Sequence, residues 1–165
     1  MIYTDEHLQS LIACRKRVVT RALKTMRMEG KQRRNDMTVE SLDGLQRFHI
    51  FIRQSDEFEE NFTIGLRYHA QDEARSFTLI RCNGKHGGQR LHPHHATFHV
   101  HRVTADDLNN GIDSERHIEE TNEYASLQEA LSYFFRLIEL DDAESYFPGL
   151  HNQWLFTDLL KEDES

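Results

Sequence analysis

The fold is decided by residues 47–69, RFHIFIRQSDEFEENFTIGLRYH. In residues 47–53 and again in residues 62–69 every second residue is apolar, the period of a strand that buries one face. The polar stretch Ser55–Asn61 between them is short enough for a hairpin connection. We therefore predict two neighbouring antiparallel strands at the centre of a sheet.

Further strand patterns follow along the chain. Ser76–Cys82 predicts a third strand, closed by a turn at Asn83-Gly84, and His95–Val103 predicts a fourth. Residues 106–122 are polar and predict a long surface loop. Strands that follow one another without alternating helices indicate an α+β fold with a four- to five-stranded, curved antiparallel sheet.

Helices are predicted at both ends. Thr4 or Asp5 can cap a helix over residues 5–28, whose apolar residues recur every three to four positions. Ser126 and Glu129 form a capping box for a C-terminal helix that packs on one face of the sheet. A helical tail is predicted over residues 143–161.

Length and composition indicate one domain spanning residues 1–165, with its core in about 37–140. Cys14 and Cys82, the only cysteines, are too few for a disulfide framework, which is typical of a reduced, cytoplasmic protein. The polar residues 1–9 do not resemble a secretory signal, and no apolar run is long enough to span a membrane. We expect a soluble cytoplasmic protein that does not use a membrane.

The formal net charge is −8, but it is unevenly distributed. Residues 15–34 hold nine Lys or Arg and one acid, a net charge of +8, whereas the rest of the chain carries −16. The ordinary explanation is the solvated face of an amphipathic helix. The alternative is a basic helix that binds RNA or an acidic protein through Arg15, Lys16, Arg17, Arg21 and Lys24.

Six of the eleven histidines lie between His86 and His101. Strand periodicity places Ala96, Phe98 and Val100 on a buried face, and His99 and His101 together on the opposite face. By the same parity, Arg53, Arg67 and His69 join that open face. We expect a patch of imidazole and guanidinium groups exposed to water.

Imidazole suits two kinds of chemistry. Two histidines two residues apart on a strand lie about 7 Å apart at the backbone and can converge on one ion. The ligands of zinc or another divalent transition metal would then come from His92, His94, His95, His99 and His101. Histidine is also the natural acid or base near neutral pH, and a pair beside an arginine could cleave RNA without a cofactor. A solvated strand face without chemistry is the third possibility.

Three segments together resemble a known group: Phe62–Tyr68, Leu79–Gly84, and the pair His99 and His101. They are similar to small bacterial proteins that look related to the TumE-like toxins of toxin–antitoxin pairs, with the similarity running from about residue 48 to 140. The resemblance implies an action on RNA and an antitoxin partner, and it makes His99 and His101 candidate catalytic residues.

The residues and the resemblance together predict a toxin-like protein that cleaves RNA without a metal. His99 and His101 would act as acid and base, with Arg67 or Arg81 at the phosphate. A non-catalytic module that binds a metal or another protein is the alternative. The sequence is also compatible with an oligomer.

Overall fold

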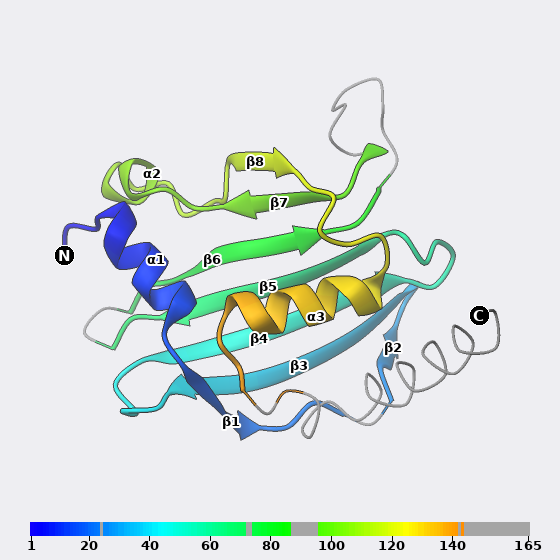
Figure 1. Cartoon of the computed structure of the whole chain (residues 1–165), viewed down its shortest axis with the longest axis horizontal. Helices are drawn as coiled ribbons and strands as arrows, with labels where there is room; N and C mark the ends of the chain where they lie inside the picture. The colour runs from blue at the N-terminus through cyan, green and yellow to red at the C-terminus, as the bar shows by residue number, and fades with distance from the viewer. Residues whose placement is uncertain (24, 72–73, 87–95, 142, 144–165) are drawn as a thin grey trace, which may run out of the picture.

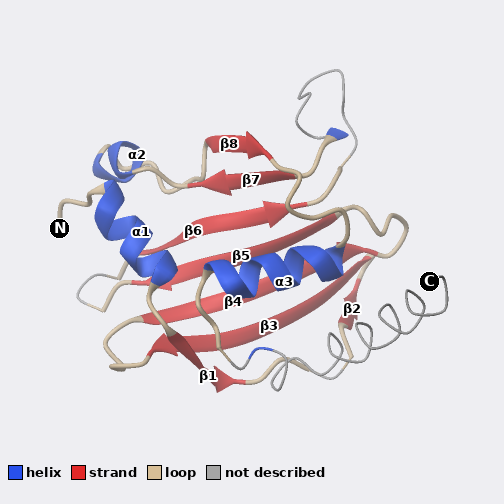
Figure 2. Cartoon of the chain, in the orientation of Figure 1, coloured by secondary structure: helices blue, strands red, loops and turns tan. Residues whose placement is uncertain are grey.

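A computed structural model describes residues 1–23, 25–71, 74–86, 96–141 and 143. It confirms an α+β fold with an N-terminal helix, a large antiparallel sheet and a helix after the last strand (Figures 1 and 2). The helices are α1 (Asp5–Ala13), α2 (Ala105–Asn109) and α3 (Leu127–Leu137). The strands are β1 (Lys16–Thr20), β2 (Arg27–Glu29), β3 (Gln32–Ser41), β4 (Arg47–Ser55), β5 (Phe62–His69), β6 (Ser76–Asn83), β7 (His99–Arg102) and β8 (His117–Glu120).

The strands of the described ranges form one sheet in the order β1-β3-β4-β5-β6-β7-β8, and β2 also pairs with β3. Every strand pairing is antiparallel, and from β3 onward each strand lies beside its neighbour in the sequence. The predicted β4–β5 hairpin is confirmed, with Ile50 opposite Leu66 and Ile52 opposite Ile64. All four of these side chains are 0% exposed, so this hairpin lies at the centre of the core.

Helices α1 and α3 cover the same face of the sheet (Figure 1). Leu8, Leu11 and Ile12 of α1 join the core there, together with Leu131 and Phe134 of α3. The opposite face is not covered by a helix of the described residues, and we call it the helix-free face. None of the described helices combines the length and apolar character that crossing a bilayer requires.

The predicted helix caps are present. The Thr4 side chain accepts a hydrogen bond from the backbone N–H of His7 and begins α1. The Ser126 hydroxyl accepts from the Glu129 N–H, and the Glu129 carboxylate accepts from the Ala125 N–H. Helix α3 therefore begins at the predicted capping box.

The predicted N-terminal helix over residues 5–28 is wrong beyond Ala13. Cys14 has an extended backbone (φ −64°, ψ 141°), and β1 begins at Lys16. The β-branched run Val18-Val19-Thr20 favours a strand, and pairing with β3 satisfies its backbone. The described basic residues of 15–34 consequently lie in strands and in the segments between them, not on one helix face.

The sheet is also larger than the four to five predicted strands. Strand β3 lies between the predicted N-terminal helix and the first predicted strand, where no strand is predicted, and it buries Met37 and Val39 on the core face. The predicted loop 106–122 contains the end of α2 and all of β8. In contrast, the strand predicted over residues 95–103 is shorter in the structure, where β7 spans only His99–Arg102. Apart from Ala143, the predicted tail 143–161 lies outside the described residues.

Candidate functional site

The helix-free face is defined by strand register. Ile50, Leu66 and Ile80 are paired across β4, β5 and β6 and point into the core under the helices. Their sequence neighbours therefore point to the other side. The side chains that define the helix-free face are Asp36, His49, Phe51, Arg53, Gly65, Arg67, His69, Arg81, Asn83, His99 and His101. The predicted placement of Arg53, Arg67 and His69 on the histidine face agrees with this register.

One group of side chains on this face is a histidine cluster, formed by His86, His99 and His101. The ring centroids of His99 and His101 lie 5.0 Å apart, and those of His86 and His99 lie 5.2 Å apart. The two β7 histidines therefore share a face as predicted, with Val100 between them on the core side.

Hydrogen bonds fix the tautomers of the two β7 histidines. The Nδ1 atom of His99 lies 2.8 Å from the carbonyl oxygen of Thr97, and the Nδ1 atom of His101 lies 3.0 Å from that of Glu115. A carbonyl oxygen can only accept, so each Nδ1 carries the proton. In the neutral rings Nε2 is then the atom with the lone pair, the atom that can bind a proton or a metal.

The expected exposure of these histidines is wrong. His99 is 0% exposed and His101 is 8% exposed. The reason is that β7 is not an edge strand, because β8 pairs along its other side and His86 lies against His99. Phe98 and Ala96, predicted as buried strand residues, precede β7 and are half-buried, with Phe98 packed against Phe62 and Tyr124.

The two predicted arginines occupy different positions relative to this cluster. Arg81 lies directly opposite His101 in the β6–β7 ladder, and it forms an ion pair with Glu115, with 2.6 Å between Nε and the carboxylate oxygen. Arg67 lies on β5 and donates to the Ser76 hydroxyl from Nε (3.2 Å) and Nη2 (3.0 Å). The structure thus brings Arg81, and not Arg67, next to the histidine pair.

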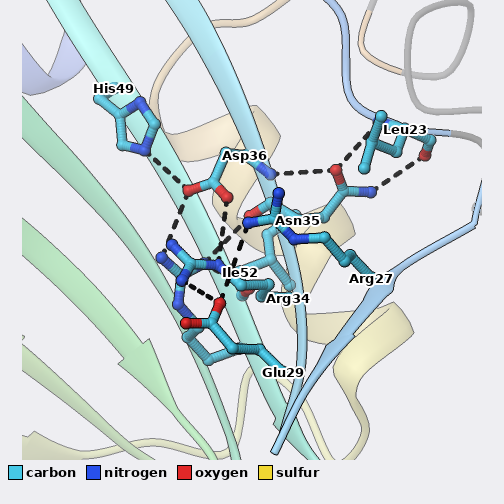
Figure 3. Close-up of polar contacts among 9 residues, drawn as sticks. Leu23, Arg27, Glu29, Arg34, Asn35, Asp36, His49 and Ile52 are labelled. Carbon is cyan, nitrogen blue, oxygen red and sulfur yellow. Dashed lines mark hydrogen bonds and ion pairs between the residues drawn. The ribbon is translucent and has the colours of Figure 1, made fainter.

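A second group of polar side chains lies on β3 and β4 and was not predicted (Figure 3). The Asp36 carboxylate accepts from Nε2 of His49 at 2.8 Å and lies 3.3 Å from Nη2 of Arg53. Arg34 lies 3.7 Å from the same carboxylate and also pairs with Glu29. Burial opposes ionisation of Asp36, but the hydrogen bond from His49 and the charge of Arg53 outweigh it and lower its pKa.

Two cross-strand pairs extend this second group onto β5. Arg47 lies opposite His69, and His49 lies opposite Arg67. Burial, followed by the charges of Arg67 and His49, lowers the pKa of His69. The sequence signal that could have located the group is the alternation of Asp36 with Met37 and Val39, which marks β3 as a strand.

The predicted basic helix is wrong, because α1 ends at Ala13, before all of the described candidate residues. Arg15 is paired with Asp141, and Arg17 is paired with Glu40. Lys16 is only 1% exposed, so its ammonium group is buried and does not face a ligand at the surface. Arg21 precedes β2 in an exposed segment, and Lys24 lies outside the described residues.

The predicted metal ligands divide into two sets. His92, His94 and His95 lie outside the described residues. Within the described ranges, no group of three or more His, Cys, Asp or Glu side chains is arranged to hold a metal ion. The described chain therefore contributes His99 and His101 as neighbouring imidazoles and no complete ligand set.

Comparison with protein-family models, with curated proteins and with solved structures finds no match to this chain.

Proposed function

We propose that the protein is a toxin-like, metal-independent ribonuclease whose reaction takes place at His99 and His101. The observation that supports this proposal is the 5.0 Å separation of the two imidazole rings on one strand, with Arg81 opposite His101. An acid, a base and a guanidinium group are then present in one place. The antitoxin partner rests on the resemblance alone.

The chemistry follows from the Nε2 atoms. The neutral ring removes the proton of a ribose 2′-hydroxyl as the 2′-oxygen attacks phosphorus. The protonated ring gives its Nε2 proton to the departing 5′-oxygen, so the P–O5′ bond breaks and a 2′,3′-cyclic phosphate forms. Arg81, half-buried beside Glu115, supplies the cation for the phosphate. Of the two residues, His101 at 8% exposed lies nearer the surface than His99 at 0%.

The test is cleavage of a short single-stranded RNA by the full chain. His101→Ala and His99→Ala are each expected to lower the rate by about 100-fold or more, and the double variant by little more. The control is His117→Ala, because His117 is a solvent-exposed β8 residue paired with Glu119. The wild-type rate should depend on pH as a bell-shaped curve, and a chelator should leave it unchanged. Equal rates in wild type and His101→Ala would refute the proposal.

A second candidate function is binding of zinc or another divalent transition metal. It is favoured by the bonds from Nδ1 of His99 and His101 to backbone carbonyls, since metal-binding histidines are commonly oriented in this way. Zinc should then raise the melting temperature of wild type and His117→Ala but not of His101→Ala. A rate that a chelator abolishes and zinc restores would favour this function over the metal-independent one.

A further inference from the structure

Four side chains form a compact basic patch on the helix-free face, away from the histidine cluster. Arg47 and His49 lie on β4, and His69 and Arg67 lie opposite them on β5. Directly opposed side chains in an antiparallel pair have Cβ atoms about 5 Å apart, and residues two apart on a strand are about 7 Å apart. The two cross-strand pairs therefore occupy one small area, which we call the Arg–His patch.

The Arg–His patch is accessible to a ligand. Arg47 and His69 are exposed, and His49 and Arg67 are half-buried. The half-buried pair is held in place, because Asp36 accepts from His49 at 2.8 Å and Ser76 accepts from Arg67 at 3.0 Å. The patch thus combines two oriented groups with two that can move to meet a ligand.

Within the patch, His49 is paired with Asp36, but the two arginines are not paired with a carboxylate of the described residues. Among the described residues, no carboxylate lies within ion-pair distance of Arg47 or Arg67. Glu40, the β3 residue opposite Arg47, is paired with Arg17 at 2.6 Å. Asp36 is likewise engaged by Arg53 and by His49. The guanidinium groups of Arg47 and Arg67 therefore have no carboxylate partner among the described residues, although both belong to the same small area of the sheet.

The lowered pKa of His69 agrees with this arrangement. Burial and the positive charges of Arg67 and His49 disfavour a proton on His69. A bound anion would counter those charges and raise the pKa of His69. Arg47 on β4 and Ser76 on β6 face His69 across the sheet, His49 lies diagonally opposite it, and Arg67 lies two residues away on its own strand.

We propose that the Arg–His patch binds a phosphate group. A phosphate offers several acceptor oxygens and up to two negative charges, which two guanidinium forks and two imidazoles can match together. The phosphate can belong to an RNA terminus or be free inorganic phosphate, and the chemistry of recognition is the same. This site is separate from the proposed cleavage at His99 and His101 and does not depend on it.

The experiment is a titration of the full chain with inorganic phosphate at constant ionic strength, followed by NMR of the histidine ring protons. Phosphate should shift the His69 and His49 resonances with saturation and raise the apparent pKa of His69. Arg47→Gln and Arg67→Gln should each weaken phosphate binding about tenfold, as expected for the loss of one charge-assisted contact. Arg47 is exposed, so Arg47→Gln tests the site without endangering the fold.

The matched control is Arg116→Gln, which removes the same charge from a side chain that is 60% exposed and paired with Asp107. Its affinity for phosphate should equal that of wild type. Unsaturable shifts in wild type, or equal affinities in wild type and Arg47→Gln, would overturn the proposal.

Two RNA oligonucleotides of one sequence, with and without a 5′-phosphate, distinguish the sources of the phosphate. Tighter binding of the 5′-phosphorylated oligonucleotide identifies an RNA terminus as the ligand. If both oligonucleotides bind equally weakly while inorganic phosphate binds with saturation, the ligand is the free ion. His101→Ala should bind phosphate normally, so failure of the cleavage proposal and failure of this one are distinguishable.

Discussion

Lys16 shows how one residue connects distant parts of the chain. Its Nζ donates to the carbonyl oxygens of Ile12 and Cys14 at 2.7 Å and of Ile138 at 2.9 Å. It also lies 4.7 Å from the centroid of the Phe48 ring. The three carbonyls belong to the C-terminal ends of α1 and α3, where backbone acceptors lack helical partners and the helix dipoles are negative. The ammonium group therefore caps two helices at once.

Replacing Lys16 by Met should destabilise the protein by about 3 kcal/mol or more, because it leaves buried carbonyl groups without their donor. The measurement is the free energy of unfolding in urea at pH 7. The control is Arg15→Gln, since Arg15 is 64% exposed and its ion pair with Asp141 contributes little. A loss equal to that of the control would contradict a capping role for Lys16.

The pH dependence gives a second measurement on the same pair of proteins. Burial lowers the pKa of Lys16 from 10.5 to about 8. Between these values the unfolded chain binds more protons than the folded chain, so stability rises with pH in this window. The difference in unfolding free energy between wild type and Lys16→Met should therefore grow from pH 8 to pH 10.5. Parallel curves would show that Lys16 titrates normally.

The histidine cluster shows what residue patterns can predict about a site. Alternation correctly placed His99 and His101 on one face, because the side-chain period of a strand is fixed. It could not predict their burial, because that depends on β8, which pairs with β7 from a segment expected to be a loop. The pairing of Asp36 with His49 was missed for a related reason, since β3 was not predicted and no register could be assigned.

At the scale of elements, a strand or helix was predicted correctly where the spacing of its apolar residues was regular and its ends carried turn or capping residues. The β4–β5 hairpin has strict alternation, and α3 has both an apolar stripe and the Ser126 capping box. Residues 15–28 have apolar spacing compatible with a helix, but Val18-Val19-Thr20 and the pairing with β3 favour a strand. Local spacing could not decide between them, because the partner strand lies across a turn at Gly30.

The β4–β5 pairing supports a prediction about Gly65. A Cβ atom at Gly65 would lie 2.1 Å from Cζ of Phe51, which occupies the opposite position on β4. Gly65→Ala should therefore destabilise the protein by about 1–3 kcal/mol through overpacking. The measurement is again urea unfolding.

A double-mutant cycle separates this packing effect from a general intolerance of the strand. In a Phe51→Ala background the added methyl group meets no ring, so Gly65→Ala should cost much less there. An equal cost in both backgrounds would show that the contact with Phe51 is not the cause.

At the scale of the whole molecule, folding disperses the charge asymmetry of the sequence. Residues 15–34 carry +8 as a segment, but Arg15 meets Asp141, Arg17 meets Glu40 and Arg33 meets Asp56. The acidic partners come from distant parts of the chain, so the segment alone could not reveal them. Arg47 on β4 and Arg67 on β5, in the Arg–His patch, lie outside these ion pairs, and we propose that they are available to a phosphate.

The sheet as a whole should be unevenly stable, and amide hydrogen exchange can measure this. Strands β4 and β5 have hydrogen-bonded neighbours on both sides and lie under α3, so amides of Ile50 and Leu66 should exchange only by global unfolding. Strand β2, three exposed residues paired with β3, and β8, paired with β7, should exchange by local opening.

Comparing amide protection in wild type and in Lys16→Met tests whether the stability of the sheet is uneven. Because it lowers the global free energy of unfolding, it should reduce protection of the β4 and β5 amides by the same amount that urea unfolding measures. Protection of the β2 and β8 amides should hardly change, since their opening leaves the ends of α1 and α3 intact. Equal losses of protection in all four strands would mean that the sheet opens only as one unit, and unchanged protection in β4 and β5 would mean that Lys16 does not support the core.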